Sequence, residues 1–201
     1  MTFRDLNLKK PLWNALDDLG YETPTTIQAA SFNVMMSGKD TIGIAQTGTG
    51  KTLAYILPCL CMWKFSKEPH PQILIIVPTR ELAIQIAENF EAYGRHTPLN
   101  CTVIFGGVAQ GPQVTALRNG VDVVIATPGR LLDLMNQGHI SLREVEIFVL
   151  DEADRMLDMG FSDQLDAIVG HFSQKPQTFM FSATIPPMIS KLAQKYLSDP
   201  Q

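Results

Sequence analysis

The sequence predicts an α/β domain in which helices cover both faces of a mostly parallel sheet. Six short apolar runs recur along the chain, and each is rich in β-branched or aromatic residues. Because these runs are continuous rather than alternating, they indicate strands buried on both faces, as in a parallel sheet. Segments with helical spacing separate the runs, which is typical of a doubly wound fold. The predicted strands are residues 41–45, 73–77, 101–105, 122–126, 147–150 and 178–182.

Three other segments carry clear helical signals. Residues 11–20 place leucines on one stripe and end at Gly20, which suits the end of an amphipathic helix. Residues 53–63 form an uncharged apolar stretch. It is much shorter than the roughly 20 residues that cross a bilayer, so it predicts a buried helix. Residues 80–94 repeat apolar residues on one face and end at Gly94.

Composition favours a single domain over residues 1–201, because no linker-like stretch or repeat interrupts the chain. The net charge of −4 argues against binding nucleic acid through a general positive field. Helix N-termini could still bind phosphates locally. The N-terminus has no apolar secretory segment, and nothing predicts a membrane span. Three cysteines, all in apolar runs, indicate free thiols in a reducing compartment. We therefore expect a cytoplasmic protein.

A glycine-rich loop, "AQTGTGKT", follows the first predicted strand and opens the apolar helix. This is the context of a P-loop, in which backbone N–H groups and a lysine hold phosphates and a hydroxyl reaches Mg²⁺. Its first position is alanine where the P-loop pattern has glycine, and an ordinary glycine-rich turn is the alternative. The predicted phosphate-binding residues are Ala45, Gln46, Thr47, Gly48, Thr49, Gly50, Lys51 and Thr52.

Carboxylates crowd the end of the fifth predicted strand, in "IFVLDEADRM". An aspartate that closes an apolar strand holds Mg²⁺ in P-loop enzymes, and Asp151 fills that place. Glu152 is positioned to orient or deprotonate an attacking water. The alternative is an acid-rich helix start that complements the helix dipole. With the P-loop, we predict Lys51, Asp151 and Glu152 as catalytic residues, and Thr52 and Asp151 as ligands of a Mg²⁺ that arrives on ATP.

The letters Asp-Glu-Ala-Asp at 151–154 resemble the signature of the DEAD-box ATP-dependent RNA helicases. The chain is similar to the first of that family's two RecA-like domains from Phe3 to about Pro200. The resemblance implies a RecA-like P-loop NTPase domain that uses ATP and Mg²⁺. Compact motifs without long insertions suggest a bacterial type.

An adenine site near the N-terminus is implied by the same resemblance. Residues 20–28, within an N-terminal region 1–29, look like the family's Q motif. In that motif Gln28 reads the adenine edge, and the isolated aromatic Phe3 stacks on the base. Tyr21 and Thr23 belong to the same segment. From the residues alone, the segment is also typical of a helix start with Thr23 as the N-cap.

Three further motifs follow strands and resemble the family's RNA-contacting segments. Two of them place a threonine where it can cap a helix, which leaves N–H groups free for phosphate. Such contacts grip the RNA backbone, whether single strand or duplex, without reading its sequence. The predicted RNA-binding residues are Pro78, Thr79, Arg80, Gly106, Gly107, Thr127, Pro128, Gly129 and Arg130.

A last motif, Ser182-Ala183-Thr184, ends the sixth predicted strand. The resemblance implies that Ser182 and Thr184 hydrogen-bond near Asp154. In this interpretation, Asp154 couples the nucleotide state to strand separation and does not bind metal.

The family's second RecA-like domain, which supplies an arginine-bearing motif, has no counterpart in these residues. An arginine finger contributes about 10³ to 10⁵ in turnover, so we expect the chain alone to be nearly inactive. The full enzyme would close two domains over ATP and RNA, act as a monomer and unwind an RNA duplex locally. Two alternatives stay open. One is a non-catalytic RNA-binding or scaffold module, and the other is a DNA-directed P-loop motor.

Overall fold

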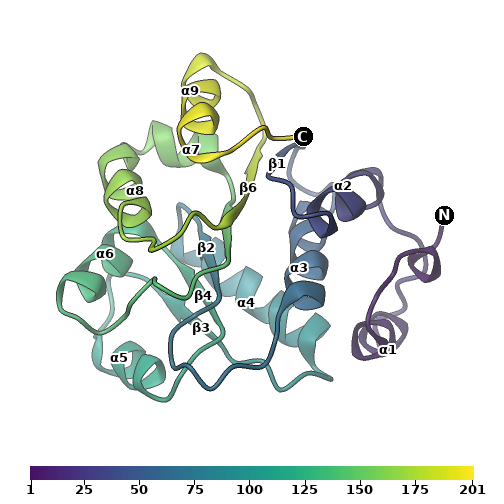
Figure 1. The fold of residues 1–201 in the computed structure, drawn as a ribbon, viewed down its shortest axis with the longest axis horizontal. Helices are drawn as coiled ribbons and strands as arrows, with labels where there is room; N and C mark the ends of the chain where they lie inside the picture. Colours follow the sequence, from purple (N-terminus) through teal and green to yellow (C-terminus); the bar gives the residue numbers. More distant parts are fainter.

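A computed structural model describes residues 1–201, and its centre is a six-stranded sheet in which every pairing is parallel (Figure 1). The strand order is β1-β6-β5-β2-β4-β3. All six predicted strands are confirmed within one residue at each end, and so is the α/β fold class. The strands are β1 (Thr41–Ile44), β2 (Ile73–Ile76), β3 (Cys101–Ile104), β4 (Val123–Ala126), β5 (Ile147–Leu150) and β6 (Gln177–Ser182).

Nine α-helices and one 3₁₀ helix surround the sheet. The helix predicted at 53–63 is confirmed as α3, and all but two of its twelve residues are buried. The helix predicted at 80–94 is α4, with those bounds. The helices are η1 (Phe3–Asp5), α1 (Lys10–Asp18), α2 (Thr26–Met36), α3 (Lys51–Met62), α4 (Arg80–Gly94), α5 (Gly111–Arg118), α6 (Pro128–Asn136), α7 (Ala153–Asp158), α8 (Ser162–Val169) and α9 (Pro187–Tyr196).

The sheet separates two hydrophobic cores, because successive side chains of a strand point to opposite faces. In β2, Ile73 and Ile75 pack with helices α1 to α4. Leu74 and Ile76 pack with helices α5 to α9 on the other face. Figure 1 shows α1, α2 and α3 on one side of the sheet, and α5, α6 and α8 on the other. Because both faces of the sheet are buried, each strand is an unbroken run of apolar residues in the sequence.

Parallel pairing brings the carboxyl ends of all six strands to one edge of the sheet. The loops after β1, β6 and β5 adjoin one another, and those after β2, β4 and β3 form a second group. The predicted P-loop and carboxylate residues follow the first group of strands, and the predicted RNA residues follow the second. No helix combines the length and apolar character needed to cross a membrane.

Candidate nucleotide and RNA site

The loop between β1 and α3 has the backbone of an anion cradle. Gly48 and Gly50 take left-handed conformations with φ of 83° and 89°, and Gly50 is the N-cap of α3. Thr49 Oγ1 donates to the carbonyl of Gln46 at 2.7 Å, which closes the turn. Ala45 has no positive φ, and its N–H donates to the carbonyl of Ser182 at 3.1 Å. The alanine that departs from the P-loop pattern is therefore accommodated without strain.

One cavity of about 290 Å³ joins this loop to the carboxylates that follow β5. Lys51 and Asp151, far apart in the sequence, are 6% and 2% exposed and line it together. Thr52 and Glu152 line it as well, so the predicted catalytic and metal residues converge on one volume. The full lining is Thr47, Gly48, Gly50, Lys51, Thr52, Leu82, Gln85, Asp151 and Glu152. Leu82 and Gln85 come from α4 and carry no sequence signal, because they look like ordinary helix residues.

Both oxygens of the Asp151 carboxylate accept hydrogen bonds within the protein. Tyr55 Oη donates to Oδ2 at 2.9 Å, and the N–H of Glu152 donates to Oδ1 at 2.8 Å. Burial raises the pKa of Asp151, while the charge of Lys51 and the Tyr55 hydrogen bond oppose that rise. Burial and the neighbouring Asp151 raise the pKa of Tyr55 well above its ordinary value, so its hydroxyl remains a donor. Sequence analysis missed Tyr55, because it lies inside an apolar run.

Glu152 adopts a strained backbone conformation at the start of α7. Its φ of 53° and ψ of 47° are left-handed, which costs a non-glycine residue of order 1 kcal/mol. Its Oε2 lies 3.3 Å from Nη1 of Arg155 in an ion pair at the surface. The turn lets two adjacent carboxylates take different partners at one cavity.

The donor set of this cavity fits a magnesium ion that is carried by a nucleotide. No group of three His, Cys, Asp or Glu residues forms a metal cluster of its own. The hydroxyl of Thr52 and the carboxylate of Asp151 supply hard oxygen donors at the cavity wall. Mg²⁺ commonly takes one or two protein oxygens and completes its shell with phosphates and water.

The loops after β2, β3 and β4 also meet, as parallel pairing requires. Arg80 lies with its guanidinium carbon 5.1 Å above the ring of Phe105, just before Gly106 and Gly107. Arg130 Nη2 donates to the carbonyl of Val108 at 3.0 Å, across the same loop. The structure thus brings the predicted RNA residues to one surface, although both arginines also hold the glycine loop in place.

The two threonines at this surface differ as helix caps. Thr79 is the N-cap of α4, and its Oγ1 accepts from the N–H of Leu82 at 3.3 Å. Thr127 is the N-cap residue of α6, followed by Pro128 and Gly129, but its side chain makes no capping hydrogen bond. The predicted cap is confirmed in full at Thr79 and only by position at Thr127.

Comparison with known proteins decides the family. The model of the DEAD/DEAH box helicases matches residues 25–192. The chain belongs to the DEAD/DEAH box helicase family. It is 46% identical over 200 residues to the ATP-dependent RNA helicase DeaD of Mycobacterium tuberculosis, covering 99% of this chain and 35% of that protein. It is 45% identical over 202 residues to the DEAD-box ATP-dependent RNA helicase 30 of Arabidopsis thaliana, covering 98% and 34%.

Among solved structures, the fold superposes on a DEAD box protein from Methanococcus jannaschii with a TM-score of 0.94. The two chains are 37% identical, and the match covers 100% of this chain and 55% of that one. This likeness confirms the RecA-like fold. The chain spans about a third of the length of the two curated relatives. Those relatives come from a bacterium and a plant, so a bacterial origin stays a prediction.

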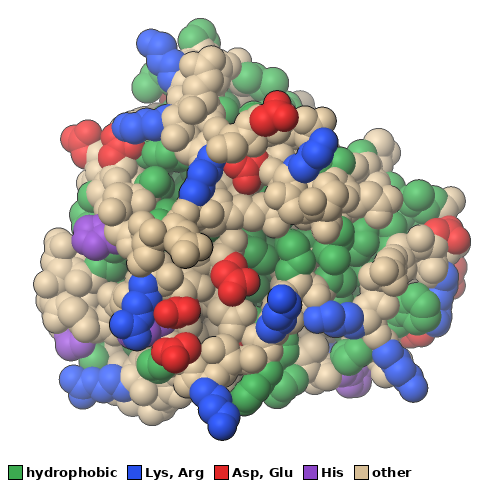
Figure 2. Space-filling view, in the orientation of Figure 1, with side chains coloured by type: hydrophobic (Ala, Val, Ile, Leu, Met, Phe, Trp, Pro, Cys, Tyr) green, Lys and Arg blue, Asp and Glu red, His purple; other side chains and the backbone are tan.

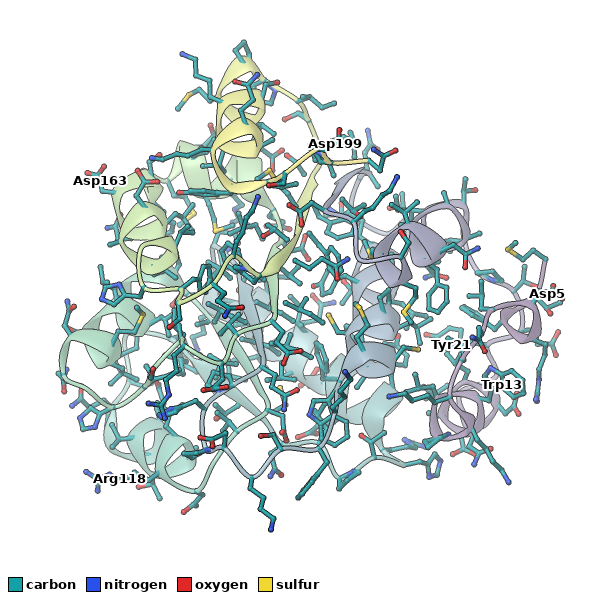
Figure 3. The ribbon with its side chains drawn as sticks, viewed as in Figure 1. Asp5, Trp13, Tyr21, Arg118, Asp163 and Asp199 are labelled. Carbon is teal, nitrogen blue, oxygen red and sulfur yellow. The ribbon has the colours of Figure 1, made fainter.

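In this DEAD/DEAH box domain, the residues predicted to contact adenine differ in how exposed they are. Phe3 is 4% exposed and packs in the first core, and it also lines a cavity beside Trp13 and Tyr21. Its stacking on a base stays a prediction. Tyr21 is 44% exposed and stands beside Tyr93, with ring centroids 6.1 Å apart. Figure 3 shows Tyr21 and Trp13 at the N-terminal end of the molecule, beside α1.

The helix of the Q motif starts two residues later than predicted. Thr25, not Thr23, is the N-cap of α2, because Thr23 lies in the preceding turn. Gln28 is buried: its Oε1 accepts from the N–H of Thr25 at 2.9 Å, and its Nε2 donates to the carbonyl of Gly50 at 3.1 Å. The amide that was predicted to read adenine is thus engaged with the P-loop in this structure.

In this DEAD/DEAH box domain, the hydrogen bond predicted between Thr184 and Asp154 is present, and the coupling role stays a prediction. Thr184 Oγ1 donates to Asp154 Oδ2 at 3.0 Å. Burial opposes ionisation of Asp154, but hydrogen bonds from Thr184 and from the N–H of Arg155 outweigh it and lower the pKa. Ser182 is fully buried, and its hydroxyl makes no hydrogen bond of good geometry, but its side chain also contributes to the lowered pKa of Asp154. Ala183 is exposed between them.

Proposed function

We propose that this chain is the ATP-binding half of an ATP-dependent RNA helicase. The observation that carries the proposal is the single cavity at which Lys51, Thr52, Asp151 and Glu152 converge. Family membership and the names of the relatives support the same activity.

Each side chain of the cavity has a distinct role in this proposal. The N–H groups of the P-loop and the ammonium of Lys51 bind the β- and γ-phosphates of ATP. Thr52 and Asp151 would hold Mg²⁺, which would neutralise charge on the phosphates. Glu152 orients a water toward the γ-phosphorus and accepts its proton as the bond to the β-phosphate oxygen breaks.

The RNA strand, in the same proposal, lies over the loops that follow β2, β3 and β4. Arg80 and Arg130 supply positive charge there, and Thr79 and Thr127 add hydroxyls and helix N-termini. These groups suit phosphate and sugar oxygens, so binding does not depend on base sequence. Figure 2 shows basic and acidic side chains intermixed over the face that it displays, so that face offers no single-signed field for RNA.

In this proposal, a second RecA-like domain of the same polypeptide completes the ATPase and RNA-binding sites. It supplies the arginine that the cavity lacks and closes over ATP and RNA, and the protein acts as a monomer. Turnover then releases a locally separated strand. All three cysteines are free thiols, which supports a reducing compartment such as the cytoplasm.

The test is ATP hydrolysis by the full-length protein with single-stranded RNA or with DNA of the same sequence. We expect stimulation by RNA only, and a loss of roughly 10² or more in Lys51→Ala because a charge at the transferring phosphate is removed. Lys67→Ala, at an exposed lysine, is the matched control. Absence of hydrolysis with intact RNA binding would identify a non-catalytic module. Equal stimulation by DNA would identify a DNA-directed motor.

A further inference from the structure

We infer that Tyr55 is a positioning residue for the magnesium ligand Asp151. Its hydroxyl fixes the carboxylate in the orientation that accepts the nucleotide's metal ion. This inference rests on the proposed function, since it concerns the same cavity. Sequence patterns gave Tyr55 no role beyond the core.

The contact between the two side chains joins segments that are distant in the sequence and shielded from water. Tyr55 is 0% exposed and Asp151 is 2% exposed, and their oxygens lie 2.9 Å apart. A buried carboxylate is costly unless its oxygens are hydrogen-bonded. With one oxygen bound by the Glu152 N–H and the other by Tyr55, the plane of the carboxylate is fixed.

Helix α3 presents the lysine and the tyrosine together. Lys51 and Tyr55 are four residues apart, so they lie on the same side of the helix, one turn from each other. The first supplies positive charge near Asp151, and the second supplies a neutral donor. A neutral donor can hold the carboxylate without competing with Mg²⁺ as a second cation would. One helix thus sets both the phosphate-binding charge and the geometry of the metal ligand.

The ring of Tyr55 is also fixed by its packing in the core. Phe181 of β6 packs against it, with ring centroids 5.2 Å apart and an interplanar angle of 50°. Phe181 in turn fills the space above Gly43 in β1, where an added Cβ would lie 2.3 Å from its Cε1. Gly43, Phe181 and Tyr55 form a continuous packed path to Asp151, which we name the Asp151 support. A support this tight leaves the hydroxyl little freedom to leave the carboxylate.

The test compares nucleotide affinity with and without magnesium in the 201-residue chain. A non-hydrolysable ATP analogue is titrated calorimetrically with excess Mg²⁺ and again with excess EDTA. The ratio of the two dissociation constants, EDTA over Mg²⁺, is the magnesium factor. We expect Tyr55→Phe to lower the magnesium factor about fivefold, the effect of one lost hydrogen bond. The dissociation constant in EDTA should change less than twofold, because the phosphate-binding groups are untouched.

Tyr196→Phe is the matched control. Tyr196 also donates its hydroxyl to a carboxylate, Asp166, at 2.5 Å, and it too is buried. That pair joins α9 to α8 and does not line the cavity. The control therefore removes the same kind of hydrogen bond and should leave the magnesium factor unchanged. Should Tyr55→Phe fail to fold, Phe181→Leu tests the same support, with an expected loss of about twofold to threefold.

The outcomes separate this inference from the proposed function. A wild-type chain with a magnesium factor near one would overturn both. If the wild-type chain has a magnesium factor well above one and Tyr55→Phe has the same factor, only the role of Tyr55 is overturned. An equal loss in Tyr196→Phe would also overturn it, because the effect would then follow from general destabilisation.

Discussion

Replacement of Gly43 by alanine tests the packing behind the nucleotide site. The added methyl would lie 2.3 Å from Cε1 and 2.5 Å from Cδ1 of Phe181, and ordinary carbon contacts begin near 3.4 Å. Phe181 is fully buried against Tyr55, so its ring must shift by about 1 Å in a packed core. Overpacking of this kind costs about 1–3 kcal/mol.

A smaller gain opposes that cost. Gly43 has no positive φ, so alanine also restricts the unfolded chain and contributes about 0.4–1 kcal/mol of stability. The net expectation for Gly43→Ala is a loss of about 1–2 kcal/mol in the free energy of unfolding. For a chain of this length that corresponds to roughly 2–8 °C in melting temperature. The magnesium factor should fall as well, because the displaced ring bears on Tyr55.

Urea denaturation followed by far-ultraviolet circular dichroism measures the effect, with Gly111→Ala as the control. Gly111 opens α5 with no positive φ and has no atom within 4 Å of an added Cβ, so its replacement should be neutral or stabilising. Equal stability of Gly43→Ala and wild type would refute the reasoning. It would mean that Phe181 has room to move and that the Asp151 support is loose.

Three further predictions concern other parts of the molecule. Thr79→Ala should lower the free energy of unfolding by about 1 kcal/mol through loss of its cap, and Thr127→Ala by clearly less; equal losses would contradict the assigned hydrogen bond. Hydrogen bonds from Lys195 and Tyr196 lower the pKa of Asp166. That stabilisation is present above the unfolded pKa of about 3.9 and is lost as the pH falls through the folded pKa. Asp166→Asn should therefore reduce the melting temperature at pH 7 but not in strong acid, and a constant difference across pH would argue against the pairing. In the full-length protein, Glu152→Gln should slow RNA-stimulated hydrolysis by about 10² or more with ATP affinity little changed, and retained turnover would remove Glu152 from catalysis.

Local sequence patterns were enough to predict the strands and the class of ligand expected at the site. The six strands were predictable because parallel strands bury both faces and so need unbroken apolar runs. The P-loop was predictable because close approach to a phosphate needs glycine at fixed spacing before a helix. The roles predicted for Lys51 and Asp151 rest on chemistry that only a few residue types can perform.

At some positions, packing rather than the local signal decided the surroundings of a residue. The isolated aromatic at Phe3 suggested a base-stacking group, but the N-terminal segment folds back and buries it. Thr23 before a proline suggested a helix cap, yet the turn extends to Thr25. In both cases the residue type was informative, and the path of the chain decided its use.

By itself, the sequence determined that this protein would build a parallel α/β sheet with a phosphate site, because strand burial and glycine spacing are local properties. Only the tertiary structure decided the strand order and which distant groups meet. Three contacts depend on this packing of the elements. They are the Tyr55–Asp151 hydrogen bond, the hydrogen bond from Gln28 to Gly50, and the lining of the cavity by residues of α4. Such contacts join residues whose separation along the chain carries no periodic signal, so they become visible only when the elements pack.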